Sequence, residues 1–215
     1  MIFIGDTHGK VQDYISILEL YPDQPTVQVG DFGLGFVGNE PADEFITGYI
    51  KDDPHHRFIR GNHDNPAACR ACPNWLPDGT VEGDVMFIGG AWSIDKAWRT
   101  QGFDWWEDEE CSYDQLFEFV DTYDRVRPRV MVTHDAPLNV TEKHFVSVGK
   151  ALAKIQIQTR TQLAFQSMFE IHQPELWVFG HWHTHLDVIE NGTRFICLEE
   201  CQTCEVDMDT LDVTY

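Results

Sequence analysis

Five short stretches of the sequence carry side chains that can hold metal ions and move protons. They are Gly5-Asp6-Thr7-His8, Gly30-Asp31, Arg60-Gly61-Asn62-His63-Asp64, Thr133-His134-Asp135 and Gly180-His181-Trp182-His183. Carboxylate and neutral imidazole together suit Mn, Fe, Zn or Ni better than Ca or Mg alone. In the third stretch the asparagine offers a neutral oxygen ligand, the histidine a proton, and the aspartate a partner that orients this histidine. These residue types predict a metal site with acid–base chemistry beside it.

The spacing within two of the stretches favours binding of one metal ion by two side chains. Asp6 and His8 are two residues apart, as are His181 and His183. Residues i and i+2 of an extended chain share a face, so each pair can reach one ion. One such pair is weak evidence for a metal site, but five loops with metal-binding side chains in one chain are strong evidence.

The elements before these stretches are expected to bring them together. Each stretch follows a short apolar run that predicts a buried strand. The runs are residues 1–5, 26–29, 56–59, 130–132 and 177–179. Apolar residues at helical spacing fall between the first three, at Val11, Tyr14, Ile15 and Leu18 and at Phe45, Ile46, Tyr49 and Ile50. This β-α-β-α-β order predicts a mostly parallel sheet, and ligands bind at the carboxyl ends of such strands.

The rest of the chain is expected to complete one domain over residues 1–215. Residues 65–84 are predicted to be a loop, 85–88 a strand, and 94–110 neither helix nor strand. A helix is predicted around Leu116, Phe117, Val120 and Tyr123, and another over 148–172 with Leu152, Ile155, Met168 and Phe169 facing inward. Residues 187–198 predict a hairpin, because Asn191-Gly192 suits a type I′ turn. Residues 204–213 predict a last strand or hairpin.

Composition limits the class of protein and its partners. The formal net charge is −21, which disfavours binding of extended nucleic acid. No apolar run approaches the ~20 residues that a membrane span needs. The motif at residue 5 leaves no room for a signal peptide, so a cytoplasmic location is the expectation. The sequence does not indicate an oligomeric state.

Cysteine spacing leaves one alternative open. Cys69/Cys72 and Cys201/Cys204 form two C-x-x-C pairs among six cysteines, and four thiolates could hold a structural zinc ion. The pairs lie far apart in the sequence, without the usual zinc-ribbon separation. Reduced thiols are the favoured interpretation for a cytosolic chain.

In order and content, the five stretches resemble the motifs of the calcineurin-like metallophosphoesterases, including bacterial and phage-type members. The resemblance spans residues 5–183 and implies an α/β fold, a four-layer α/β/β/α sandwich with the β-rich tail in the second sheet. It implies two divalent metal ions. Asp6, His8, Asp31 and His183 resemble the ligands of the first ion, and Asp31, Asn62, His134 and His181 those of the second. His63 matches the catalytic histidine of the family and Asp64 the carboxylate behind it.

The resemblance also implies the reaction. A hydroxide shared by the two ions would attack phosphorus in line, and His63, oriented by Asp64, would protonate the leaving oxygen. The expected activity is that of a phosphodiesterase or phosphatase on small phosphate esters or nucleotides, with a slight preference for diesters. Mn²⁺ is the expected metal, with Fe, Zn or Ni open. The alternatives are a nuclease on the same fold and a non-catalytic metal-binding interaction module.

Departures from the family pattern concern the substrate. The phosphoprotein-phosphatase branch carries Gly-Asp-x-x-Asp-Arg-Gly in its second motif, whereas residues 30–35 here lack that second Asp and the Arg. This disfavours protein-phosphatase activity. Arg60, Lys96 and Arg99 are candidate phosphate contacts, and a nearby tryptophan could stack on a base.

Simpler roles are open for several of these residues. Lys96 and Arg99 could pair with Asp104, Glu107 or Asp108, and the tryptophans could cover the core. Arg60 could have a packing or ion-pair role. Asp135 could orient His134 or be solvated, and His185 could lie near the site or on the surface.

Overall fold

The structure is a computed structural model, which describes residues 1–146 and 158–215. Its first sheet has five strands in the order β11-β10-β1-β2-β3. The strands are β1 (Ile2–Ile4), β2 (Thr26–Gln28), β3 (His56–Phe58), β10 (Thr203–Val206) and β11 (Val213–Thr214). β1, β2 and β3 are parallel, and β10 runs antiparallel to β1.

The second sheet has six strands in the order β4-β5-β6-β7-β9-β8. The strands are β4 (Thr80–Glu82), β5 (Val85–Ile88), β6 (Val130–Thr133), β7 (Leu176–Phe179), β8 (Leu186–Glu190) and β9 (Thr193–Cys197). The four central strands are parallel and the edge strands β4 and β8 are antiparallel to their neighbours. Between β8 and β9, Asn191 and Gly192 have φ of 50° and 93°, as a type I′ turn requires.

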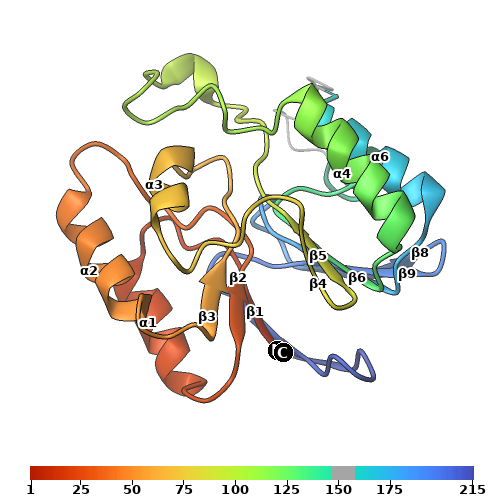
Figure 1. Cartoon of the computed structure of the whole chain (residues 1–215), viewed down its shortest axis with the longest axis horizontal. Coiled ribbons are helices and arrows are strands. Elements are labelled where there is room, and N and C mark those ends of the chain that lie inside the picture. The colour runs from red at the N-terminus through yellow and green to blue at the C-terminus, as the bar shows by residue number, and fades with distance from the viewer. Residues whose placement is uncertain (147–157) are drawn as a thin grey trace.

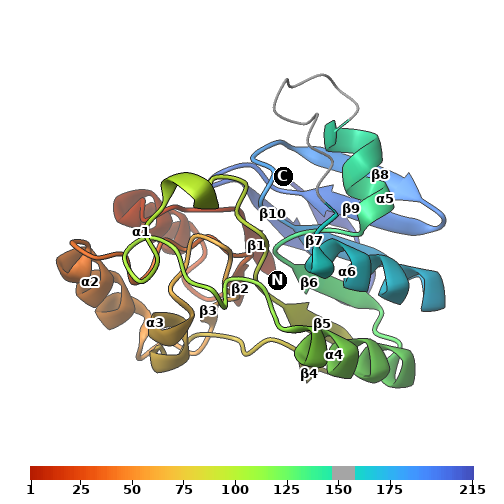
Figure 2. The ribbon, with the colours of Figure 1, turned by 90° about the horizontal axis from the view of Figure 1, so that it is seen from above.

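Helices cover the outer face of each sheet (Figures 1 and 2). Against the first sheet lie α1 (Val11–Leu20), α2 (Glu40–Ile50) and α3 (Pro66–Ala71). Against the second lie α4 (Tyr113–Val126), α5 (Leu138–Thr141) and α6 (Arg160–Ile171), with the π-helical turn η2 (Glu142–Val146) after α5. A short 3₁₀ helix, η1 (Lys96–Trp98), lies in the long segment between β5 and α4.

The period-two pattern of the strands explains the four layers. In β1, Ile2 and Ile4 pack with the α1–α3 helices, whereas Phe3 between them packs against the second sheet. In the same way Trp177 of β7 faces α6, and Val178 faces the first sheet. Both inner faces therefore form one apolar layer, and the predicted α/β/β/α sandwich is confirmed. The single domain stays a prediction.

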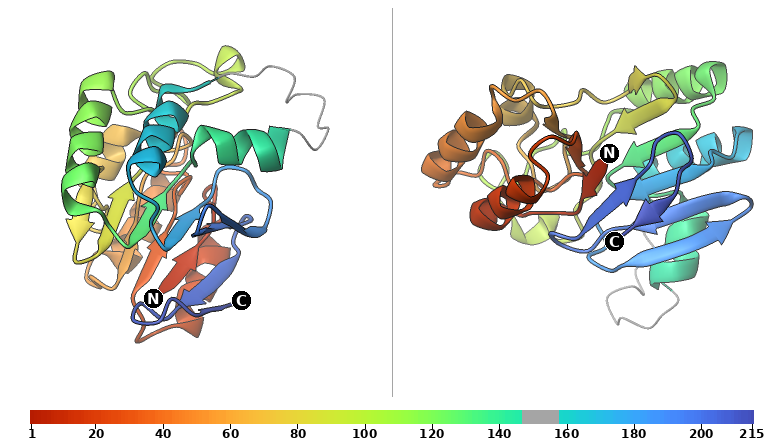
Figure 3. Two further views of the ribbon diagram at one scale, coloured as in Figure 1. Left: turned by 90° about the vertical axis from the view of Figure 1, so that its right-hand side faces the viewer. Right: turned by 90° about the horizontal axis from the view of Figure 1, so that it is seen from below.

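One prediction about a chain segment was wrong, and another holds only in part. Residues 65–84 are not all loop, because α3 and β4 lie there. Asn65 caps α3 by accepting a hydrogen bond from the Ala67 amide, and Pro66 suits a first helical position. A helix of six residues is too short to show helical periodicity. The β-rich tail divides between the sheets, since β8 and β9 lie in the second sheet as predicted, whereas β10 and β11 join the first sheet, where β10 pairs with β1 (Figure 3).

Other predictions hold with changed limits. The last helix begins at Arg160, with Thr159 as its cap, and its residues Met168 and Phe169 are buried as expected. Leu152 and Ile155, also predicted to face inward, lie outside the described residues. On α2 and α4, Phe45, Tyr49 and Phe117 are exposed, although the helical periodicity that located them was right. No helix in the described ranges has the length and hydropathy to span a membrane.

Candidate metal centre

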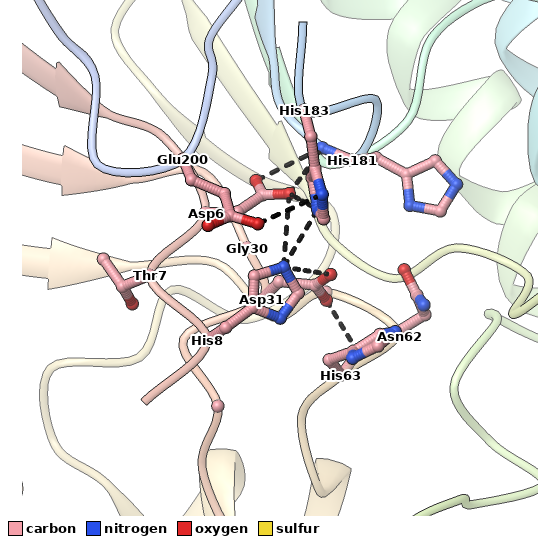
Figure 4. A network of polar contacts seen from close by, with 12 residues as sticks. Asp6, Thr7, His8, Gly30, Asp31, Asn62, His63, His181, His183 and Glu200 are labelled. Atoms are coloured by element: carbon pink, nitrogen blue, oxygen red, sulfur yellow. Dashed lines mark hydrogen bonds and ion pairs between the residues drawn. The ribbon is translucent and has the colours of Figure 1, made fainter. Parts of the chain in front are cut away.

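The loops that follow β1, β2, β3, β6 and β7 meet at one end of the two sheets, where the candidate side chains converge (Figure 4). Two glycines permit this approach. A Cβ on Gly61 would lie 2.1 Å from Oδ1 of Asp31, and one on Gly180 would lie 2.1 Å from Oδ1 of Asp6. Side chains at either position would push the ligand carboxylates away.

Asp6, His8, Asp31 and His183 form a first cluster, in which one possible ligand atom of each lies within 4.8 Å of the others. Nε2 of His183 is 3.1 Å from Oδ2 of Asp6, and Nε2 of His8 is 3.7 Å from Oδ2 of Asp31. The two histidine Nε2 atoms are 2.9 Å apart. Lone-pair atoms gathered in this way are suited to a shared cation.

Asp31, His134 and His181 form a second cluster. Oδ1 of Asp31 lies 3.2 Å from Nε2 of His134, and the side-chain oxygen of Asn62 lies 3.1 Å from the same nitrogen. The two carboxylate oxygens of Asp31 thus face different clusters. All seven predicted ligands are brought together, and Asp31 stands between the two groups.

Backbone strain marks the same residues. His8, Asp31, His181 and His183 have positive φ angles of 46°, 55°, 68° and 46°. Few residues other than glycine adopt this region, and such conformations cluster at functional sites. The surrounding structure therefore holds four candidate ligands in backbone geometries that their side chains disfavour.

Hydrogen bonds outside the motifs orient two of the ligands. Nδ1 of His134 lies 2.8 Å from the carbonyl oxygen of Val29 and donates its proton there, which leaves the Nε2 lone pair facing the cluster. Nδ2 of Asn62 donates to Oγ of Ser93, whose hydroxyl donates to Glu109. This relay turns the Asn62 oxygen toward His134. No role for Ser93 or Glu109 was predicted, because their partners lie 31 and 16 residues away in the chain.

The charge balance of the site fits a cation. Burial alone would raise the pKa of Asp31, but His134 holds it well below its ordinary value. Burial would lower the pKa of His134, but the charge of Asp31 raises it to about 10. Asp31 thus favours positive charge on His134, and a metal ion can take the place of that proton. Asp, His and Asn donors suit a first-row divalent ion, so the residues fit the metals that the sequence predicts.

His63 lies beside the first cluster, with its ring in edge contact with that of His8 at 4.9 Å between centroids. Burial lowers the pKa of His63 to about 4, and the Arg99 cation acts in the same direction. One terminal nitrogen of Arg99 lies 2.8 Å from Nδ1 of His63 and also contacts Nε2. The Arg99 guanidinium is held by an ion pair with Asp95.

Asp64 has contacts different from the predicted ones. Its carboxylate accepts hydrogen bonds from the backbone amides of Phe32, Gly33, Leu34 and Gly61. Both oxygens are thereby occupied, and the described residues show no hydrogen bond from Asp64 to the His63 ring. Asp64 therefore fastens the β2 loop to the β3 loop, and the ring of His63 faces Arg99 instead.

Arg60 does not face the site, and its contacts favour the ion-pair role that was left open for it over a phosphate contact. Its guanidinium is buried, and each of its three nitrogens has a partner. Nε donates to Asp78 at 2.7 Å, Nη1 to the carbonyls of Asp108 and Glu109, and Nη2 to Sγ of Cys111. Arg60 thus anchors the segment between β5 and α4 beneath the site.

Replacing Arg60 with methionine should destabilise the fold by about 3–5 kcal/mol, because the carboxylate of Asp78 would be left buried without its cation. Urea unfolding measures this loss. The matched control is Arg57→Met, since Arg57 forms a more exposed ion pair with Glu82 and should contribute less than about 1 kcal/mol. Equal losses for the two variants would contradict a structural role for Arg60.

The other polar residues considered in the sequence, Lys96, Asp135 and His185, do not contact the two clusters in the described hydrogen bonds and ion pairs. Lys96 is exposed, and its Nζ lies 5.3 Å from the Trp92 ring centroid and 6.0 Å from that of Trp105. Asp135 accepts hydrogen bonds from the indole of Trp182 and the amide of Gln162, so it holds the β7 loop rather than the His134 ring. His185 contacts Gln202 and lies on the surface.

The cysteines form no zinc site in the described ranges, where the possible metal-binding groups include none of them. All six are free. Cys69 and Cys72 pack below the first sheet, whereas Cys204 packs between the sheets. Five of the cysteines are buried and Cys201 is half-buried, and their reduced state stays a prediction.

Comparisons with known proteins agree with this geometry. A sequence model of the calcineurin-like phosphoesterases matches residues 1–185. No curated protein matches the chain. Among solved structures, a candidate 5′-nucleotidase from Staphylococcus aureus, in complex with alpha-ketoglutarate, has 12% identity and a TM-score of 0.54, covering 99% of this chain and 52% of that chain.

Two further structures are similar at lower scores. An archaeal phosphodiesterase has 12% identity and a TM-score of 0.47, covering 100% of this chain and 98% of its own. Plasmodium GAP50, an anchor in the inner membrane complex, has 14% identity and a TM-score of 0.49, covering 93% of this chain and 71% of its own. The chain spans about half the length of the nucleotidase, and the likeness to that structure is one of fold.

Proposed function

The chain belongs to the calcineurin-like phosphoesterase family, and from this premise we propose that it is a metal-dependent hydrolase of small phosphate esters. The observation that carries the proposal is the pair of clusters that share Asp31. One carboxylate placed between two sets of metal-binding side chains is the arrangement that a dinuclear centre needs.

The proposed centre holds two divalent ions. Asp6, His8, Asp31 and His183 would bind the first, and Asp31, Asn62, His134 and His181 the second. When bound, the ions would supply Lewis-acid stabilisation of the phosphate and an activated water for in-line attack. Mn²⁺ is the proposed metal, with Fe, Zn and Ni as the alternatives that the same donors accept.

His63 and Arg99 act on two different oxygens of the substrate phosphate in this proposal. His63 lies next to the first cluster and donates a proton to the leaving oxygen. Arg99, whose fork of donors matches a phosphate, lies beside it and binds a non-bridging phosphate oxygen. A phosphate dianion entering between them would favour the protonated form of His63. Arg99 thereby supplies the arginine that the second motif lacks.

The substrate class follows from charge and size. A net charge of −21 disfavours a long polyanion, so the proposed substrates are small mono- or diesters, with nucleotides and other diesters slightly preferred. Lys96, close to Trp92 and Trp105, offers a further cation and aromatic faces in the same segment as Arg99. The free cysteines support a cytoplasmic location, which we also propose.

The decisive test of this function is metal reconstitution. Metal-free protein would receive Mn²⁺, Fe²⁺, Zn²⁺ or Ni²⁺ and be assayed on p-nitrophenyl phosphate, bis-p-nitrophenyl phosphate, cyclic nucleotides, dinucleoside polyphosphates, phosphopeptides and plasmid DNA. We expect turnover of small esters with added metal and none with chelator present. Absence of turnover with every metal would contradict the proposal and favour a binding module. Preferential, salt-sensitive plasmid cleavage would instead indicate a nuclease.

Arg99→Ala should lower kcat/KM by about 10–100-fold, because a hydrogen bond between charged groups contributes about 1.5–3 kcal/mol. Steady-state kinetics on the best ester from the screen measure the effect. Arg70→Ala is the matched control, since Arg70 is an exposed arginine paired with Asp108. The phosphate contact would be refuted if both variants kept wild-type kcat/KM.

A further inference from the structure

His183 differs from the other ligands of the first cluster in its exposure. Its side chain is 43% exposed, whereas that of Asp6 is fully buried and that of His8 is 19% exposed. A half-exposed imidazole on a strained loop can rotate or change tautomer unless something holds it. Its Nε2 faces Asp6 at 3.1 Å, so any such restraint must act on the other ring nitrogen.

Glu200 acts on that nitrogen. Its Oε1 lies 3.2 Å from Nδ1 of His183, the ring nitrogen that does not face Asp6 (Figure 4). Its Oε2 pairs with the ammonium group of Lys10, which lies two residues after His8. The carboxylate is therefore tied to both histidine-bearing loops of the first cluster.

The backbone places Glu200 firmly. It lies in the turn between β9 and β10, which is fastened to the end of β1. The Cys201 amide donates to the Asp6 carbonyl at 2.9 Å, and the Gly5 amide donates to the Gln202 carbonyl at 2.8 Å. This turn follows residue 185, where the match to the family ends. The chain thus adds to the motif loops a residue from outside them.

We infer that Glu200 is a positioning residue for the first metal ion: it accepts the Nδ1 proton of His183 and so presents the Nε2 lone pair to the ion. The inference rests on the proposed metal centre. The carbonyl of Val29 does the same for His134 in the second cluster. A carboxylate partner also makes the ring a stronger donor to the metal, and loss of such partners typically costs about 10–100-fold in metal affinity.

A purely structural role for Glu200 predicts that its removal lowers the folding stability of the metal-free protein. Lys10 and Glu200 are 45% and 35% exposed, and ion pairs at such sites contribute little to folding stability. Removal of Glu200 should therefore leave the unfolding of the metal-free protein unchanged while it weakens metal binding. The two roles are separated by these two measurements.

The experiment titrates Mn²⁺ into metal-free protein by calorimetry. We expect Glu200→Ala to weaken one of two Mn²⁺ sites by about 10–100-fold, and Glu200→Gln to weaken it less, because the amide oxygen still accepts the Nδ1 proton. Glu199→Gln is the matched control, with the same charge change one residue earlier, and should bind as wild type. Urea midpoints of the metal-free proteins should coincide.

Variants that keep only one of the two clusters show which metal ion the loss of Glu200 affects. In His181→Ala, which keeps the first cluster, adding Glu200→Ala should weaken the binding that is left. In His8→Ala, which keeps the second, it should change nothing. Unchanged Mn²⁺ affinity in Glu200→Ala, or equal weakening of both sites, would overturn the inference alone. A wild-type protein that binds neither Mn²⁺ nor Zn²⁺ would overturn the proposed centre as well.

Discussion

Replacing His63 with alanine should lower kcat by about 10²–10⁴-fold, the usual contribution of a positioned general acid. His63 is not among the residues of either cluster, so the variant should keep its full metal content by elemental analysis. A loss of turnover with the metals in place separates proton transfer from metal binding. His55→Ala, an exposed histidine of the loop before β3, is the matched control and should keep wild-type kcat.

The leaving group sharpens this test. p-Nitrophenolate departs as a stable anion, whereas an alkoxide needs a proton as its bond to phosphorus breaks. The loss in His63→Ala should therefore be larger for an alkyl phosphate than for p-nitrophenyl phosphate. Equal losses on both substrates would count against the acid role. They would indicate that His63 acts through its neighbour Arg99, whose guanidinium it contacts.

Local sequence was sufficient to predict that the candidate ligands lie together, because each one follows a short apolar strand. Parallel strands place their carboxyl ends at one edge, so Asp6, Asp31 and Asn62 had to lie near each other once β1, β2 and β3 were recognised. The second sheet adds His134 and His181 in the same way. The alternation of side-chain direction along β1 likewise gives the strand two packing faces, with Phe3 on one and Ile2 and Ile4 on the other.

Contacts between distant segments could not be predicted in this way. Ser93 orients Asn62 across 31 residues, and Glu200 meets His183 only because β10 returns to the edge of β1. Arg60 belongs to the same motif as Asn62 yet points into the protein, where its guanidinium pairs with Asp78. Residue type gives a side chain its possible chemistry, but its direction is decided by packing.

Strain is the second feature that the sequence could not reveal. The positive φ angles of His8, Asp31, His181 and His183 oppose the preference of each residue. Such conformations persist only where the surroundings determine them. Here the surroundings are hydrogen bonds between loops, such as those from the Thr7 and His8 amides to the Asp31 carbonyl at 3.0 and 2.8 Å. The candidate ligands of the proposed centre would thus be oriented before any ion binds.

Asp31→Asn should be more damaging than loss of any other ligand. The amide keeps the shape of the side chain and can still accept the hydrogen bond that the His63 backbone now gives to Oδ1 at 2.6 Å, so the loop should keep its conformation. What disappears is the one negative charge common to both clusters. Removal of one preorganised electrostatic group costs about 10²–10³-fold in kcat, and this change weakens two ions at once. We expect a loss of ~10³-fold or more and loss of both metal ions.

Comparison with single-ligand variants makes the sharing of Asp31 testable. His8→Ala and His134→Ala each remove a donor from one cluster only, so each should lose one ion and leave the other. If Asp31 serves both ions, Asp31→Asn should resemble the His8→Ala/His134→Ala double variant in metal content, although it changes one residue. Asp43→Asn, in which a carboxylate that accepts from the Gly35 amide is neutralised away from the clusters, should keep both ions. An Asp31→Asn protein that lost a single ion would mean that the two clusters bind independently, and the dinuclear centre would have to be abandoned.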